Sequence, residues 1–201
     1  MLLRAAVATI GAIISMGCAR TSMTSVAAPE VAGRTFANIL VVALFADLGV
    51  RQETEARFAE GSENASTRFI PSSSVLFPGR QYTQRELESV LREHRIDGTL
   101  VISSGGAGTS TGYVPPTYTS QCTVWTSLGG CQQVTTTTSG GYNYSKPWAQ
   151  FTAQLYDVNS GRVVWYGTAT TGGNAFASAT TLVRSMAGKT LARLAADGLI
   201  R

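Results

Sequence analysis

Continuous apolar runs and alternating stretches predict the strands of this chain. Residues 39–45 and 99–102 are uninterrupted apolar runs rich in β-branched side chains, which predicts two strands buried on both faces of a sheet. Residues 151–158 alternate between apolar and polar positions, and Asn159-Ser160-Gly161 predicts a tight turn into a return strand over 162–166. We therefore expect two central buried strands and a later β-hairpin.

The segment between the two buried strands has the features of a capped helix followed by a broken strand. Asp47 is a suitable N-cap for a helix over about residues 48–60. Arg51 and Glu55 are spaced i,i+4 on its polar face, which predicts a surface or partly buried ion pair and, as an alternative, a partner contact. Residues 66–77 contain short apolar groups interrupted by a proline and three serines, and they predict one short, interrupted strand.

Two further helices are indicated by caps and by an apolar stripe. Thr83 and Glu86 form a capping box, and Asp97-Gly98 closes the helix that follows it. The last helix is expected over about residues 177–196. Its core stripe comprises Leu182, Val183, Met186, Thr190, Leu191 and Leu194.

The order of these elements predicts an α+β fold. The chain runs β-α-β-α-β, continues through a long insertion, and ends β-β-α. We expect one mixed sheet of about five strands packed by three helices, in a single domain over residues 35–201 with a hairpin-like insertion at 103–147.

The first residues indicate export. Arg4 precedes an apolar run from Ala5 to Gly17 that is interrupted only by Thr9 and Ser15. This run is shorter than the ~20 residues needed to cross a bilayer as a helix. A signal peptide over residues 1–17 is therefore expected.

Cys18 directly follows small residues at the end of this leader, and the junction resembles the lipobox of bacterial lipoproteins. The resemblance implies that the Cys18 thiol receives a diacylglycerol and that the chain carries palmitate. The lipobox usually has leucine three residues before the cysteine, whereas this chain has Ser15 there and Ile14 one step earlier. The alternative is a soluble periplasmic protein cleaved near Ser25-Val26-Ala27.

Residues 18–34 are small and polar with one proline, which predicts a flexible, lipidated tether between the membrane and the domain. Ala19 after Cys18 is compatible with sorting to the periplasmic face of the outer membrane, because the usual retention signal in such lipoproteins is aspartate. If Cys18 is acylated, Cys122 and Cys131 remain, and an oxidising compartment favours a disulfide between them.

The insertion differs from the rest of the chain in composition. Residues 103–145 contain no charged residue and no histidine, but they hold 17 Ser or Thr and eight Gly. Three interpretations remain open: a mobile surface loop with a pinned hairpin, a surface for a protein or glycan partner, and a membrane-inserting hairpin. The candidate partner contacts are Tyr113, Tyr118, Trp125, Tyr142 and Tyr144.

Motifs that would support catalysis are incomplete. Gly108-Thr109-Ser110-Thr111-Gly112 matches the nucleophile-elbow pattern, but Tyr113 and Val114 lead into prolines where a helix is required, and the one histidine, His94, precedes the serine. Gly188-Lys189-Thr190 imitates the end of a phosphate loop, but it falls inside the last helix, where backbone amides are already bonded. We expect no enzyme activity, and a serine hydrolase using Ser110 is the least favoured alternative.

Charge and cysteine spacing exclude other classes of function. The chain has 16 Lys or Arg and 12 Asp or Glu, and the basic residues are scattered without a run that would bind nucleic acid. Two cysteines without nearby histidines do not make a zinc site. No metal, cofactor or nucleic-acid partner is expected.

Three stretches carry a further resemblance: Arg51 with Glu55, Arg95 to Val101, and Leu155 to Trp165. In this order they resemble small bacterial envelope lipoproteins of unknown function. The αβ domain of that group is similar to those of the curli secretion lipoprotein and of the lipoprotein activators of penicillin-binding proteins. The resemblance covers about residues 36–102 and 148–200 and is a pattern of core and turn residues.

The resemblance implies a non-catalytic, periplasm-facing lipoprotein that scaffolds or contacts a protein or glycan of the cell envelope. An oligomeric secretion or pore component is the alternative.

Overall fold

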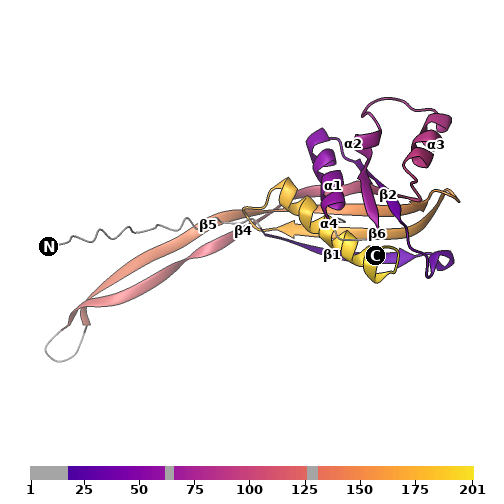
Figure 1. Ribbon diagram of the computed structural model, residues 1–201. Helices are drawn as coiled ribbons and strands as arrows, with labels where there is room; N and C mark the ends of the chain where they lie inside the picture. Colours follow the sequence, from indigo (N-terminus) through magenta and orange to yellow (C-terminus); the bar gives the residue numbers. More distant parts are fainter. Residues whose placement is uncertain (1–17, 62–65, 126–130) are drawn as a thin grey trace, which may run out of the picture.

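The protein consists of a compact body and a long two-stranded projection (Figure 1). The computed structural model describes residues 18–61, 66–125 and 131–201. Within these ranges the side chains of residues 122–125 and 131–134 are not described. The predicted signal peptide, residues 1–17, lies outside the described part. No helix within this described part is long and apolar enough to cross a membrane.

The body is built on one mixed sheet, as the sequence predicted. Its strand order is β1-β6-β5-β4-β2-β3. Neighbouring strands are antiparallel from β1 to β4, whereas β2 is parallel to both β4 and β3. The strands are β1 (Ala19–Ala27), β2 (Asn38–Leu44), β3 (Arg68–Pro71), β4 (Gly98–Trp125), β5 (Cys131–Asp157) and β6 (Arg162–Gly173).

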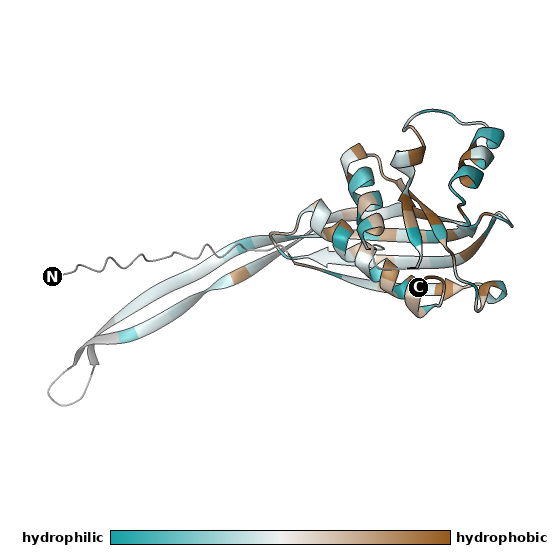
Figure 2. Cartoon of the chain, viewed as in Figure 1, coloured by the Kyte–Doolittle hydropathy of each residue, from teal (hydrophilic) through white to brown (hydrophobic). Residues whose placement is uncertain are grey.

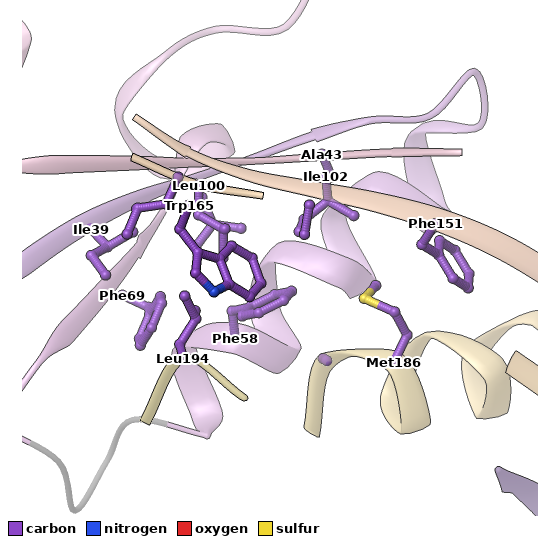
Figure 3. Packing of buried hydrophobic residues seen from close by; sticks show 14 of the residues in the cluster. Ile39, Ala43, Phe58, Phe69, Leu100, Ile102, Phe151, Trp165, Met186 and Leu194 are labelled. Atoms are coloured by element: carbon purple, nitrogen blue, oxygen red, sulfur yellow. The ribbon is translucent and has the colours of Figure 1, made fainter. Parts of the chain in front are cut away.

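Helices pack on both faces of this sheet. α1 (Leu48–Glu60) and α4 (Ala179–Ala196) cover one face and enclose the main core, in which Phe58, Trp165 and Met186 are fully buried (Figure 3). On the other face, a smaller cluster of Leu40, Ile70 and Ile96 lies beneath the one-turn helix α2 (Ser72–Val75) and α3 (Gln84–Glu93). Successive side chains of β2 point alternately into these two clusters, which explains why its sequence is continuously apolar.

The capping residues predicted for the first two long helices are confirmed. The Asp47 side chain accepts a hydrogen bond from the Val50 backbone amide at the start of α1. Thr83 and Glu86 form both hydrogen bonds of the capping box at the start of α3. These bonds satisfy amides that the first helical turn leaves without a partner.

α4 begins with a second capping box, between Ser178 and Thr181, that the sequence pattern did not reveal. Its predicted stripe faces the core, and Leu182, Val183, Met186, Thr190 and Leu194 are buried. Leu191 packs against the edge of that core.

The predicted tether is wrong over most of its length, because residues 19–27 form the edge strand β1. Thr21, Met23 and Ser25 face α4, while the intervening side chains are exposed. Thr21 Oγ1 lies 2.8 Å from Ser185 Oγ of α4, and Ser25 Oγ donates to the Asp197 carboxylate at 2.7 Å. Hydrogen bonds to β6 and to α4 fix this segment despite its weak apolar pattern, so the domain begins directly after Cys18.

The predicted ion pair between Arg51 and Glu55 does not form. Glu55 is completely buried and accepts hydrogen bonds from the Ala43 amide, the Ser72 hydroxyl and the Ser73 amide. Arg51 donates instead to the carbonyl oxygen of Phe45. Glu55 therefore joins α1 to β2 and α2, which a helix-face argument could not foresee.

The remaining differences concern the number and length of elements. Residues 66–77, expected as one interrupted strand, form β3 and then α2, so the proline ends the strand and the serines start a helical turn. The sheet has six strands because β1 was not anticipated. The hairpin-like insertion predicted at 103–147 is confirmed, and its paired strands are continuations of β4 and β5.

Candidate functional site

The extension of β4 and β5 beyond the sheet is the most prominent exposed feature of the molecule. Gly108 of β4 pairs with Trp148 of β5, and Trp148 pairs with Gly172 of β6. Beyond this row only β4 and β5 continue, and we call residues 109–125 with 131–147 the arm. At ~3.3 Å per residue the arm is about 55 Å long.

The arm is neutral in both charge and hydropathy. It is mostly pale in the hydropathy colouring of Figure 2, whereas the body shows strongly apolar and strongly polar residues in both its strands and its helices. Lys146, next to the sheet, is its only charged residue. No other helix or strand of the described part covers the arm in Figure 1, so hydrogen bonds and contacts between its two strands hold it together.

Register divides the arm into two faces. Side chains on alternate residues of a strand share a face, together with their directly opposed partners. One face, which we call the aromatic face, carries Val114, Pro116, Tyr118, Tyr142 and Tyr144. The opposite face carries hydroxyl and amide side chains along most of its length, with Tyr113 opposite Asn143 as its aromatic exception. Large apolar side chains thus gather on one side, which the linear sequence did not indicate.

Glycines make room for the aromatic rings at the base of the arm. The Trp148 ring lies over Gly108, where an added Cβ would be 3.1 Å from the ring, and the Tyr144 ring covers Gly112 in the same way. Lys146 Nζ lies 4.7 Å from the centre of the Tyr144 ring, which places a cation on the same face.

Most predicted partner contacts are accessible. Tyr113, Tyr118 and Tyr142 are 59%, 66% and 59% exposed, although Tyr113 lies on the opposite face from the other two. Tyr144 is partly covered. The fifth candidate, Trp125, is paired with Cys131 through the backbone, and its side chain lies outside the described part.

The predicted disulfide stays a prediction. Cys122 is opposite Val134 in the register, and Cys131 is opposite Trp125. The side chains of both cysteines lie outside the described part.

Cys18 lies at the base of the arm. Its carbonyl oxygen accepts a hydrogen bond from the Asn174 amide at 2.9 Å, and the next residue, Ala19, pairs with Gly173. Gly172 pairs with Trp148, so Cys18 and the arm leave the body from the same end of the sheet. We call this end the root.

The candidate catalytic residues do not form a catalytic group. Ser110 lies within β4 opposite Lys146, and its hydroxyl donates to the Lys146 carbonyl oxygen at 3.4 Å, while the Lys146 ammonium lies over Tyr144. The strand-turn-helix that a nucleophile elbow requires is absent at this described position. His94 is exposed at the end of α3. Among the described residues no three His, Cys, Asp or Glu side chains are grouped to hold a metal ion.

The carboxylate with the strongly lowered pKa belongs to the body and lies at the end of the sheet opposite the root. Asp157 is buried, and a hydrogen bond from Arg34 at 2.7 Å lowers the pKa of its carboxyl group from 3.8 to about 2. Ser160 and the Asn159 amide donate to the same carboxylate, which fixes the turn between β5 and β6. Asp157 is therefore a structural group.

Comparison with known proteins gives distant structural neighbours. No family profile and no curated protein sequence matches the chain. A PelC dodecamer from Paraburkholderia phytofirmans has a TM-score of 0.45 and 14% identity, over 87% of this chain and 97% of that one. A lipoprotein from Neisseria meningitidis has a TM-score of 0.41 and 16% identity, over 80% of this chain and 99% of that one. Likeness at this level carries no argument about function.

Proposed function

We propose that the protein is a non-catalytic lipoprotein of the cell envelope that contacts an envelope partner through its arm. The observation that carries the proposal is the arm itself. It projects about 55 Å beyond the sheet and has exposed tyrosines on both faces and almost no charge. Tyrosines amid serine, threonine and glycine provide rigid aromatic contacts and adaptable hydrogen bonds, a combination typical of protein and glycan recognition.

The proposed anchor is a lipid on Cys18, at the periplasmic face of the outer membrane. β1 begins at Ala19, so this anchor would hold the root close to the membrane, with no tether in between. Labelling with a palmitate analogue tests it. We expect the full-length chain to be labelled and the Cys18→Ser variant to remain unlabelled, whereas an unlabelled wild type would refute the anchor and favour the soluble periplasmic form.

Site-specific crosslinking in living cells tests the arm. Photoreactive amino acids at Tyr118 and Tyr142 are expected to give the same adduct, because both lie on the aromatic face. A probe at Tyr166, which is 40% exposed on β6 of the body, is the matched control and should not give it. A probe at Tyr113 distinguishes the two faces of the arm.

An arm-free variant completes this test. Ser110 is paired with Lys146, so a two-residue Asn-Gly turn can replace residues 111–145 without altering the register below it. The arm is not the contact surface if two results are obtained together. Probes on the arm give no photoadduct in the full chain, and probes on the body give the same photoadducts in the full chain and in the arm-free variant.

A second candidate function is an oligomeric secretion or pore component. Two observations favour it: the arm is uncharged beyond Lys146, and it leaves the body beside the proposed anchor. An isolated two-stranded arm has unpaired backbone groups on both edges, which a hydrocarbon environment does not tolerate, so insertion would require neighbouring arms to pair. Electron microscopy of the detergent-solubilised chain should then show rings, and a uniform population of single copies would exclude this function.

Hydrolysis is the least favoured function and is simple to test. If ester hydrolysis is measurable and is lost in Ser110→Ala, the non-catalytic assignment is wrong. We expect no hydrolysis by the wild type, because the Ser110 hydroxyl is bonded to a backbone carbonyl within a strand.

A further inference from the structure

We infer that the root of the body is a membrane-docking surface that binds the headgroup layer of a phospholipid bilayer. This surface comprises Arg20, Arg184 and Lys189 around one hollow, and the exposed Phe176 in the connection that is bonded to Cys18. The inference rests on the proposed lipid attachment at Cys18 and goes beyond it, because it assigns side chains of the folded domain to the bilayer.

Three cationic side chains meet directly beside the anchor residue. A hollow of about 370 Å³ lies between the start of β1 and the middle of α4, and Arg20, Arg184 and Lys189 line it. All three are exposed, and the remaining lining residues are uncharged. Gly188 leaves its floor open, since an added Cβ there would meet no atom within 4 Å. A hollow that is lined by three cationic side chains and by no carboxylate can bind a phosphate group.

The elements that surround the root are free of acidic residues. β1, β4, β6 and α4 contain no Asp or Glu, and the one acidic residue of β5 is Asp157 at the opposite end. An adjoining hollow between α1 and α4 includes Glu60, which is engaged with Arg57 at 2.6 Å. The basic charge near Cys18 is therefore not neutralised by the strands and the helix that carry it.

An exposed aromatic residue lies in the same region. Phe176 is 70% exposed in the connection between β6 and α4, and Asn174 of this connection donates its amide to the Cys18 carbonyl oxygen. Trp148 and Lys146, on the aromatic face, belong to the same end of the sheet. Aromatic rings with adjacent basic groups are typical of surfaces that lie at the interface between water and lipid.

The apolar sequence that precedes Cys18 favours a bilayer as the occupant. The apolar residues 5–17 join the domain at Cys18, so a membrane attachment made there brings this surface to the headgroups. The hollow lies beside the edge strand β1, so docking through it places the arm along the headgroup layer and not across the bilayer. Each basic residue near an anionic membrane surface adds to binding, and one lipid chain with a basic patch holds better than the chain alone.

Quenching of tryptophan by brominated lipids tests this inference. The full-length chain, with its leader, is produced in a bacterial host, purified in detergent and reconstituted into phosphatidylcholine vesicles with or without phosphatidylglycerol. Phe176→Trp adds a reporter at the root. Phe77→Trp is the matched control, because Phe77 is 75% exposed and follows β3 and α2 at the opposite edge of the sheet from β1.

We expect the brominated lipids to quench more fluorescence in Phe176→Trp than in the parent chain, and no more in Phe77→Trp than in the parent chain. The quenching of Phe176→Trp should increase further when phosphatidylglycerol is present. Replacing Arg20, Arg184 and Lys189 by glutamine should remove that increase. Replacing Arg85, Arg92 and Arg95 on and after α3 lowers the net charge equally and should leave it intact. High salt should abolish the increase without any substitution of the basic residues.

The two proposals fail in different ways. A chain that does not float with the vesicles refutes the lipid anchor. A chain that floats but shows equal quenching at positions 176 and 77 overturns the docking surface. Equal behaviour of the two triple variants, or an increase that survives high salt, overturns the role of the hollow.

Discussion

β4 and β5 form both the body and the arm, but the two regions are stabilised by different means. In the body these strands carry Leu100, Ile102, Phe151 and Leu155, all buried against α1 and α4 or their neighbours. In the arm the same strands consist mainly of serine, threonine, glycine and tyrosine residues, and those whose side chains are described remain largely exposed. Burial of apolar area supplies most of the stability of a fold, whereas a lone two-stranded ribbon is marginal by itself. The arm is thus free to change its surface with little effect on the body.

The largest effect should follow from removing the central core side chain. Trp165 is 1% exposed, and its Nε1 donates to the Asp197 carboxylate at 2.7 Å. Trp165→Ala should lower the free energy of unfolding by about 3–5 kcal/mol, because it leaves a cavity and removes one of the hydrogen bonds to the Asp197 carboxylate. Tyr142→Ala in the arm should change it by less than about 0.5 kcal/mol. Urea unfolding followed by far-UV circular dichroism measures both, and equal losses would mean that arm and body unfold as one unit.

The buried carboxylate of α1 should have the next largest effect. Glu55→Ala removes the acceptor of two backbone amides and one hydroxyl, so we expect a loss of about 2–4 kcal/mol. Glu53 on the same helix forms a partly exposed pair with Arg57, and Glu53→Ala should cost no more than about 1 kcal/mol. Similar losses in both variants would contradict the joining role of Glu55.

A smaller, pH-dependent effect should come from Asp157. Its pKa is lowered to about 2 by Arg34, so the contribution of this pair to stability is fully present above the unfolded pKa, near 4. This contribution is lost as the pH falls from there through 2, and we expect about 1 kcal/mol because Arg34 is partly exposed. Arg34→Gln should reduce the pH dependence of the free energy of unfolding between pH 4 and 2. An unchanged pH dependence would show that other carboxylates cause it.

The smallest effect is expected from excising the arm. Replacement of residues 111–145 by Asn-Gly should change the unfolding free energy of the body by less than about 1 kcal/mol, because none of the side chains described in 111–121 and 135–145 is buried in the core. Loss of cooperative unfolding in this variant would show that the arm contributes to the body. A stable body that loses its arm-dependent photoadducts would separate folding from recognition.

Helix starts and the central strands could be predicted because their signals are local. Asp47 and the Thr83–Glu86 capping box bond to amides within the same turn, so neighbouring residues suffice to identify them. The continuous apolar character of β2 likewise reflects burial on both faces. The Ser178–Thr181 box was missed because threonine in place of glutamate or glutamine departs from the usual pattern.

β1 could not be predicted because its partners lie far away in the chain, whereas the hairpin expected over residues 103–147 is present as the arm. β1 has small, weakly patterned side chains and is fixed by pairing with β6 and by bonds to α4, and the paired residues Ala27 and Trp165 are already 138 positions apart. The arm lacks apolar alternation, and its strands find their acceptors in each other. Glu55 looked like a surface residue on its helix and became a buried acceptor only because α2 packs over it.

The candidate site divides in the same way. The sequence alone identified the exposed tyrosines, the uncharged insertion and Cys18, because composition and a processing motif do not depend on folding. Only the tertiary structure brought Arg20, Arg184, Lys189 and Phe176 to the end of the sheet that carries Cys18. These residues come from an edge strand, a loop and a helix that are distant in sequence, and strand pairing with helix packing decides which of them share a surface.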